Sequence, residues 1–173
     1  MRKVIFGAAN SVDNYIATQD DAINWLIFSD AVHEIMNTMW KTIDAVVMGR
    51  RTYEVAAANG MDGYPGIENY VFSKTLDPAD HPKVTIVRDD VAEVVRGLKE
   101  REGGDICVMG GAAIARECFR AGLIDELGLN IHPVLLGNGK PFFMDMEEPV
   151  DLELIECREL PKGCVVLRYE VKH

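Results

Sequence analysis

The chain has 173 residues, of which 48% are hydrophobic and 27% are charged, as in a soluble globular domain. A formal net charge of -10 excludes a broad basic face for nucleic acid, and no apolar run is long enough to span a membrane. We therefore expect a cytoplasmic protein that forms a single domain over residues 1–173, with no nucleic-acid or membrane partner. A few local basic groups could still hold a phosphorylated ligand.

Short apolar runs alternate with amphipathic helical patterns along most of the chain. Apolar runs predict strands over residues 4–9, 45–48, 70–72, 84–87, 106–109 and 123–131. Residues 11–21 and 59–67 are rich in polar and turn residues and are expected as loops. The alternation predicts a mostly parallel α/β sheet.

Helices are expected between these strands. Ser29 is a suitable N-cap for the first helix, and an apolar stripe at helical spacing follows it. The stripe consists of Val32, Ile35, Met36, Met39 and Ile43. Further helices are predicted over residues 50–58, from Asp89 or Asp90 to about Glu102, and from the Gly110-Gly111 pair to about Ala121.

The tail has a different pattern. Two alternating stretches flank Pro161-Lys162-Gly163 between residues 152 and 171, which predicts an antiparallel hairpin at the edge of the sheet. The second stretch is apolar on both of its faces. Such a strand needs a cover on both faces, so we expect a homodimer that uses the C-terminal half.

The four cysteines contain no C-x-x-C pair, and we expect free thiols. A zinc site built from Cys157, Cys164 and a histidine lacks any recognised ligand spacing. We therefore predict no bound metal.

Three predicted strands end in residues suited to a phosphorylated ligand. Gly49-Arg50-Arg51-Thr52 follows the strand 45–48, and Ser73-Lys74 follows the strand 70–72. Gly110-Gly111 opens the helix after the strand 106–109. Glycines let a ligand approach the backbone, and helix N-termini favour anions. Ligands of open α/β sheets bind beyond the carboxyl ends of strands, where all three motifs fall.

Together these motifs resemble those of the dihydrofolate reductase-like superfamily. Residues 11–17 resemble its S-L-D-G-x-I-A opening, and residues 48–54 its M-G-R-x-T-[YW]-E motif. Residues 123–127 and 133–139 resemble the L-[IV]-D-E-L and P-V-x-L-G-x-G motifs. This last pair is typical of the C-terminal reductase domain of bacterial riboflavin-biosynthesis deaminase-reductases. The resemblance spans nearly the whole chain and implies a three-layer dihydrofolate reductase-like fold.

The resemblance also implies NADPH as cofactor and a set of residues that bind it. By this transfer Ala8, Ala9 and Ile16 line the nicotinamide, and Ser73 and Lys74 meet the 2′-phosphate. Other phosphates lie against Gly49, Arg50, Arg51 and Thr52. The pyrophosphate lies on Gly110, Gly111, Ala112, Ala113 and Ile114. A cis peptide, frequent between the paired glycines of this family, is expected at Gly110-Gly111.

The active-site acid has three candidates. Related enzymes place a carboxylate on the first helix, which favours Asp30, whereas a gapless count back from Met48-Gly49 reaches His33. Asp30 is preferred because a carboxylate can hydrogen-bond a pterin or pyrimidine edge and relay a proton, although helical phase argues for His33. Alternatively, Asp30 caps its own helix and His33 is a surface group. Asp13 is the third candidate, and the S-x-D motif alternatively uses it to shape a loop.

The implied function is an NADPH-dependent reductase of a small pteridine, pyrimidine or related heterocycle. The C-terminal motifs favour a 5-amino-6-(5-phosphoribosylamino)uracil reductase-like activity. Dihydrofolate reduction is one alternative, and a non-catalytic NADPH-binding or sensing protein is another. The chain lacks the arginine-rich stretch with which the riboflavin enzymes hold a ribose phosphate, and it lacks their deaminase domain.

Overall fold

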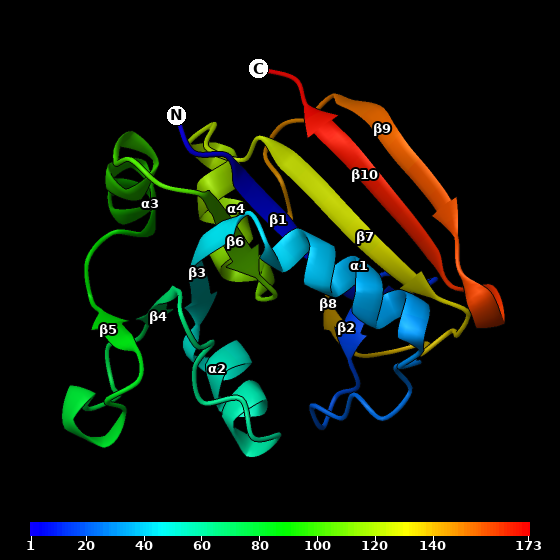
Figure 1. Cartoon of the computed structure of the whole chain (residues 1–173), viewed down its shortest axis with the longest axis horizontal. Helices are drawn as coiled ribbons and strands as arrows, with labels where there is room; N and C mark the ends of the chain where they lie inside the picture. Colours follow the sequence, from blue (N-terminus) through cyan, green and yellow to red (C-terminus); the bar gives the residue numbers. More distant parts are fainter.

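Eight strands form one large sheet in the computed structural model, which describes residues 1–173 (Figure 1). The spatial order is β5-β4-β3-β6-β1-β7-β10-β9. β1 is paired in parallel with β6 and β7, whereas β10 is antiparallel to both of its neighbours. The strands are β1 (Val4–Ser11), β3 (Ile43–Gly49), β4 (Glu68–Phe72), β5 (Thr85–Val87), β6 (Asp105–Met109), β7 (Glu126–His132), β9 (Leu152–Glu159) and β10 (Val165–Val171).

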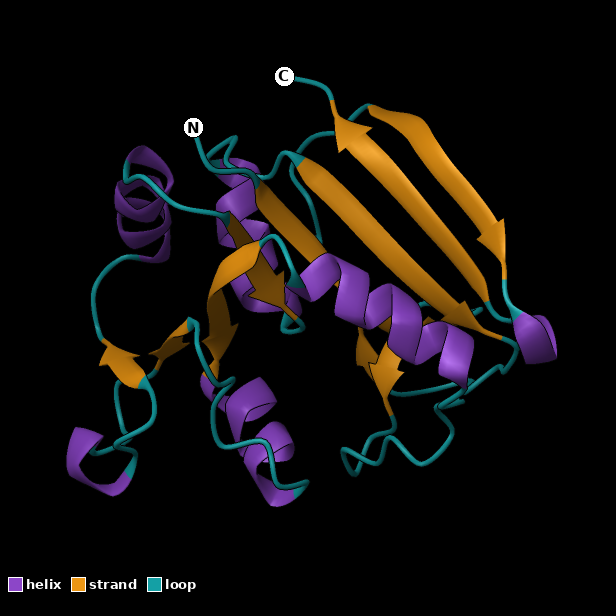
Figure 2. Cartoon of the chain, in the orientation of Figure 1, coloured by secondary structure: helices purple, strands orange, loops and turns teal.

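Four helices cover the two faces of this sheet (Figure 2). They are α1 (Asp30–Trp40), α2 (Arg50–Ala58), α3 (Val91–Glu100) and α4 (Ala112–Arg120). Val47 of β3 packs in one buried cluster with residues of α3 and α4, while its neighbour Val46 packs with Tyr53 of α2. Because successive side chains of a strand point to opposite faces, α2 lies on the face opposite α3 and α4. No helix has the length and apolar composition needed to cross a bilayer.

The predicted mostly parallel α/β sheet with an antiparallel C-terminal hairpin is confirmed. The loop at residues 59–67 and the helix over residues 50–58 are also confirmed. The hairpin turns through a 3-10 segment at Pro161–Gly163, as the sequence indicates. Ser29 caps α1, since its side chain accepts a hydrogen bond from the Val32 amide.

Several predicted boundaries are wrong. Ile43 begins β3 and is not part of the α1 stripe, because α1 ends at Trp40. Met36, expected in the buried stripe, is 41% exposed. β7 begins at Glu126 rather than Leu123: residues 123–125 precede the strand, and the Asp125 amide donates to the Val4 carbonyl.

The loop assigned to residues 11–21 contains a short strand that the sequence did not predict. This strand, β2 (Tyr15–Ala17), pairs with β8 (Lys140–Pro141) as a separate two-stranded sheet. The pairing brings Phe142 into the core, where its ring stacks on that of Phe6 at 4.7 Å between centroids. Phe142 is 1% exposed although it lies outside the large sheet. The aromatic contact therefore anchors the segment after β8 to the central strand β1.

Replacement of Phe142 by alanine tests this anchor. Loss of a fully buried aromatic ring leaves a cavity, so Phe142→Ala should lower the free energy of unfolding by about 3–5 kcal/mol. Phe28→Ala is the matched control: Phe28 is 59% exposed, and its loss should change stability by less than about 0.5 kcal/mol. Urea denaturation measures both, and equal effects of the two variants would contradict the anchor.

Candidate active site

The three motifs singled out in the sequence meet at one edge of the sheet. β4, β3 and β6 are neighbours and run parallel, so their carboxyl ends lie side by side. Gly49 ends β3, Phe72 ends β4 and Met109 ends β6. The glycine-led and basic segments that follow these strands therefore share one region of the molecule, as ligand sites in open α/β sheets do.

The Gly110-Gly111 turn brings the backbone of β6 close to α2. Both glycines have left-handed backbone angles, with φ of 51° and 64°. A Cβ added to either residue would lie 3.1–3.2 Å from side-chain atoms of Thr52, so both position and conformation require glycine. The expected cis peptide is wrong: the structure has no cis peptide bond, and two successive positive φ angles turn the chain at this point.

The two helices that start at this edge lack side-chain caps. Gly49 precedes α2 and Gly111 precedes α4, and neither can cap a helix with a side chain. By contrast, Ser29 caps α1 and Asp90 caps α3 through hydrogen bonds to backbone amides. The first amides of α2 and α4 thus have no side-chain acceptor, which is the arrangement that binds anions at helix N-termini.

Basic side chains flank these amides. Arg50 and Lys74 are exposed, and Arg50 Nη1 donates to Thr75 Oγ1 at 3.3 Å. Ser73 is buried, and its hydroxyl oxygen accepts hydrogen bonds from the amides of Thr75 and Leu76. Ser73 therefore holds the turn after β4, while Lys74 is directed to the surface.

Arg51 is engaged by Asp21 of the loop between β2 and α1. Its guanidinium donates to both carboxylate oxygens, with distances of 2.6–3.1 Å. This contact lowers the pKa of Asp21 and raises that of Arg51. Both side chains line an open groove of about 450 Å³ along α2. Arg51 thus ties this loop to the start of α2.

The remaining predicted cofactor residues fall into two groups. Ala8 and Ala9 are partly exposed near the end of β1, and Ile16 packs against the main core from β2. In the first turn of α4, Ala112 and Ile114 are buried while Ala113 is exposed. Ile114 contacts the position at which a Gly49 Cβ would stand, 3.5 Å away, so the starts of α2 and α4 are packed together.

Asp13 fastens a loop. Its carboxylate accepts hydrogen bonds from the Ser11 hydroxyl at 2.6 Å and from the amides of Leu136 and Gly137 at 3.1 and 2.7 Å. These donors lower the pKa of Asp13. Both carboxylate oxygens of Asp13 are therefore occupied. This arrangement favours the second interpretation of the S-x-D motif, in which Asp13 shapes the loop.

The two candidates on α1 are three residues apart and so are neighbours on the helix surface, with His33 nearer the flank that carries Trp40. Both Asp30 and His33 are exposed, and His33 stacks on Phe28 with 6.1 Å between ring centroids. Asp30 does not cap the helix, because Ser29 does. His33 and Trp40 are seven residues apart and share a flank. Trp40 stacks on Tyr64, whose hydroxyl donates to Met109 Sδ at the end of β6. The His33 flank is therefore the one turned toward the candidate site.

Residues that the sequence analysis missed lie beneath α1. Alternate residues of β1 and β7 point to this face, and the cross-strand pairs are Gly7 with Gly128, Ala9 with Asn130, and Ser11 with His132. Asn130 also lies opposite Val166, which packs against Val32 of α1. The only signal in the sequence was a polar residue at position 130 within an apolar strand.

His132 is buried and neutral. Its Nδ1 accepts a hydrogen bond from the Ile27 amide at 3.0 Å, so the ring proton is on Nε2, which has no partner. Burial lowers the pKa of His132. The Sγ of Cys164 lies 3.7 Å from Nδ1 and the Trp25 ring packs edge-on against the imidazole. His132 thus joins the loop before α1 to the end of β7.

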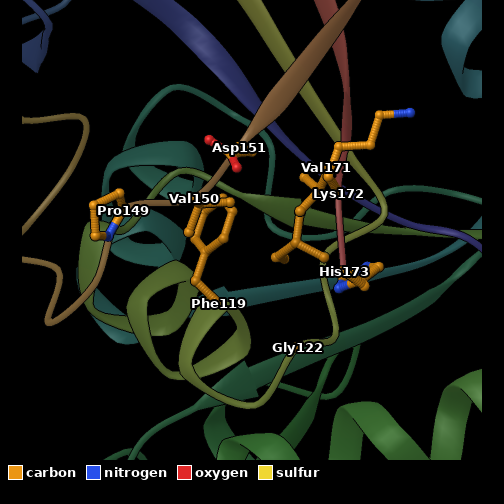
Figure 3. Close-up of a pocket in the computed structure, with 9 residues that line it drawn as sticks. Phe119, Gly122, Pro149, Val150, Asp151, Val171, Lys172 and His173 are labelled. Carbon is orange, nitrogen blue, oxygen red and sulfur yellow. The ribbon is translucent and has the colours of Figure 1, made fainter.

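Another cavity, of about 190 Å³, lies away from this edge (Figure 3). Its walls come from the end of α4, the segment before β9 and the end of β10. This is the opposite end of the sheet, where the parallel strands begin. No group of three or more His, Cys, Asp or Glu side chains is arranged to hold a metal ion, and all four cysteines are free thiols.

Sequence comparison assigns the family. The profile of the RibD C-terminal domain matches residues 2–166. The chain belongs to the RibD C-terminal domain family. A curated relative, the uncharacterized protein YwjB of Bacillus subtilis, is 30% identical over 88% of this chain and 89% of its own length. The family resemblance predicted from the motifs is confirmed.

Solved structures show the same fold. Dihydrofolate reductase from Enterococcus faecalis, complexed with NADP(H), matches with a TM-score of 0.72 and 16% identity over 99% of this chain and 97% of that one. The Thermotoga maritima deaminase/5-amino-6-(5-phosphoribosylamino)uracil reductase matches with a TM-score of 0.72 and 17% identity. That match covers 99% of this RibD-family chain and 57% of the T. maritima chain. The predicted dihydrofolate reductase-like fold is confirmed.

Proposed function

We propose that this RibD-family protein is an NADPH-dependent reductase of a small heterocycle, with an activity of the 5-amino-6-(5-phosphoribosylamino)uracil reductase kind. The observation that carries the proposal is the convergence of two uncapped helix N-termini and the Gly110-Gly111 turn at one sheet edge. Family membership and fold support it, because a T. maritima protein with the same fold is named for this reductase activity. We also propose that residues 1–173 form one domain, since β1 and β10 belong to the same sheet.

The residues at this edge fit a dinucleotide. Gly110 and Gly111 pack closely against the Thr52 side chain, where a Cβ would intrude. The amides of this turn and of α2 would hold the pyrophosphate with Ala112, Ala113 and Ile114. Arg50, Arg51 and Lys74 would supply positive charge to phosphates in a protein whose net charge is -10. Ala8, Ala9 and Ile16 would border the nicotinamide.

The protein's own contribution to the reaction is position and a proton. When bound, the nicotinamide supplies the hydride. The small residues of β1 and β7 leave room for a flat ring beneath α1, and enclosure there holds the ring in one orientation. We propose His33 as the group on α1 that orients the ring or delivers the proton, directly or through water, because its flank faces the site.

Cofactor preference tests the phosphate site. We expect tighter binding of NADPH than of NADH, measured by the fluorescence of each bound cofactor. Lys74→Ala should weaken NADPH binding about tenfold and leave NADH binding nearly unchanged, because a charge-assisted hydrogen bond to the 2′-phosphate is lost. Lys162→Ala, in the distant hairpin turn, is the control. Equal affinities for NADPH and NADH would contradict the 2′-phosphate site.

Two substitutions on α1 separate the proton donors. His33→Ala should lower turnover of the aminouracil substrate by at least about a hundredfold, with NADPH affinity intact, because a general acid is removed. Asp30→Asn should stay near the wild-type rate. The opposite pattern would assign the role to Asp30. If neither substitution matters, and a panel that includes dihydrofolate yields no substrate, the sensing alternative is supported instead.

We further propose that two copies pair through the C-terminal hairpin. β9 is the edge strand of the sheet, and it exposes Leu152 by 40%, Leu154 by 53% and Ile155 by 46%. An unpaired edge with exposed apolar side chains is a favourable surface for association. The proposed partner is a second copy of the chain.

Light scattering at micromolar concentration tests this pairing. The wild-type protein should have the mass of a dimer. Leu154→Lys should give monomers, because a charge is placed in an apolar contact, whereas Leu135→Lys, at a residue 71% exposed in another loop, should stay dimeric. A monomeric wild-type protein would exclude the dimer at that concentration.

A further inference from the structure

Asn130 is the one polar side chain beneath α1 with a hydrogen-bonding atom that lacks a partner and a surface still partly open. Its Oδ1 is buried and accepts no hydrogen bond, while the residue as a whole is partly exposed. A buried carbonyl oxygen without a donor is uncommon in folded proteins. The same carboxamide carries an N–H donor beside that acceptor. Asn130 therefore presents a donor and an acceptor side by side.

The space above Gly128 is empty. Gly128 is two residues before Asn130 on the same face of β7, and a Cβ added there would meet no atom within 4 Å. Gly7, its partner on β1, also lacks a side chain. Together with Ala9 these residues form a flat floor, and Asn130 stands at its side. A planar ring fits such a floor better than a branched molecule.

The other polar groups on this face are either paired or fully enclosed. Arg168 lies opposite Gly128, but its guanidinium donates to Glu126 at 2.6 Å and to Glu156 at 3.2 Å. Glu126 accepts a second ion pair from Lys3. His132 is 1% exposed: its Nδ1 accepts from the Ile27 amide, and its Nε2, although unpartnered, is enclosed. Asn130 is thus the side chain left to form hydrogen bonds with a ligand on this floor.

We propose that Asn130 selects the substrate ring by pairing with a lactam edge, that is, a ring N–H next to a ring C=O. Oδ1 accepts from the ring N–H, and the amide nitrogen donates to the ring carbonyl. A carboxylate at this position would instead accept two donors, as an amidine edge offers. The proposal rests on the proposed function and deepens it: the chain reads uracil-type rings in preference to aminopyrimidines.

Two matched ring pairs test the lactam edge. We expect 5,6-diaminouracil to bind the wild-type protein at least about tenfold more tightly than 5,6-diamino-1,3-dimethyluracil, in which both ring N–H groups are methylated. We also expect it to bind more tightly than 2,4-diaminopyrimidine. Titration calorimetry with and without saturating NADPH measures each affinity.

Asn130→Asp should reverse the second preference, so that 2,4-diaminopyrimidine binds more tightly than 5,6-diaminouracil. Asn37→Asp, which adds the same charge on the exposed side of α1, should leave the wild-type order unchanged. A merely structural asparagine would weaken all rings together without reversing their order. That result would overturn the proposal, as would equal affinities of the wild-type protein for 5,6-diaminouracil and its dimethyl derivative.

Gly128→Val tests the floor independently. The backbone at Gly128 is ordinary for a side chain and the space above it is open, so the variant should fold and keep its NADPH affinity. It should lose binding of every ring. Ring binding unchanged by Gly128→Val would place the ring elsewhere and overturn the proposal. Because rings are also titrated without NADPH, a failure of cofactor binding is seen separately and refutes the proposed function rather than the reading of Asn130.

Discussion

The parallel pairing of β1 on both of its sides is the constraint on which the candidate site depends. β6 and β7 run in the same direction as β1, and β3 and β4 continue the parallel order beyond β6. All five strands therefore end at one edge, so segments far apart in the sequence meet there. The residues proposed to bind the cofactor after β3, β4 and β6 and the proposed ring floor on β1 and β7 are held in place by the same backbone ladder. A site built on paired strands is more rigid than one built on loops alone.

This edge of the sheet carries local positive charge, whereas the protein as a whole is negatively charged. The net charge of -10 repels anions at long range, whereas the free amides of α2 and α4 and the arginines nearby attract them at short range. Asp21 holds Arg51 through an ion pair of 2.6 Å. An anionic ligand that recruits Arg51 must displace this carboxylate, which couples the loop between β2 and α1 to occupancy of the edge.

Local patterns in the sequence predicted many of the helices and strands. The bounds of α2 were predictable because a glycine precedes Arg50 and Asn59-Gly60 follow the last helical residue. Elsewhere, contacts between distant parts of the chain decided the structure, and local patterns gave the wrong prediction. Ile43 continues the helical spacing of α1 but pairs with Asp105 of β6, and the backbone ladder prevails over the periodicity. Phe142 follows a run of turn residues, and only its contact with Phe6 makes it part of the core.

The candidate site was predictable where glycine and basic residues mark a strand end, and not where function depends on a neighbouring strand. Gly110-Gly111 and Lys74 are recognisable from composition alone. Asn130 is not, because its position beneath α1 follows from the register of β7 with β1 and β10. The preference for His33 over Asp30 likewise depended on where Trp40 of the same helix packs.

Gly7 and Gly128 face each other across the same strand pair, yet they differ in their freedom to change. A Cβ at Gly7 would lie 2.9 Å from the Gly128 carbonyl oxygen, so almost any substitution there would push two strands apart. Position 128 has open space above it and an ordinary backbone. Within a family that shares this scaffold, single substitutions at position 128 could reshape the ring floor without disturbing the sheet. The position on β1 is thus constrained by the sheet itself, whereas the position on β7 is free to accept other side chains.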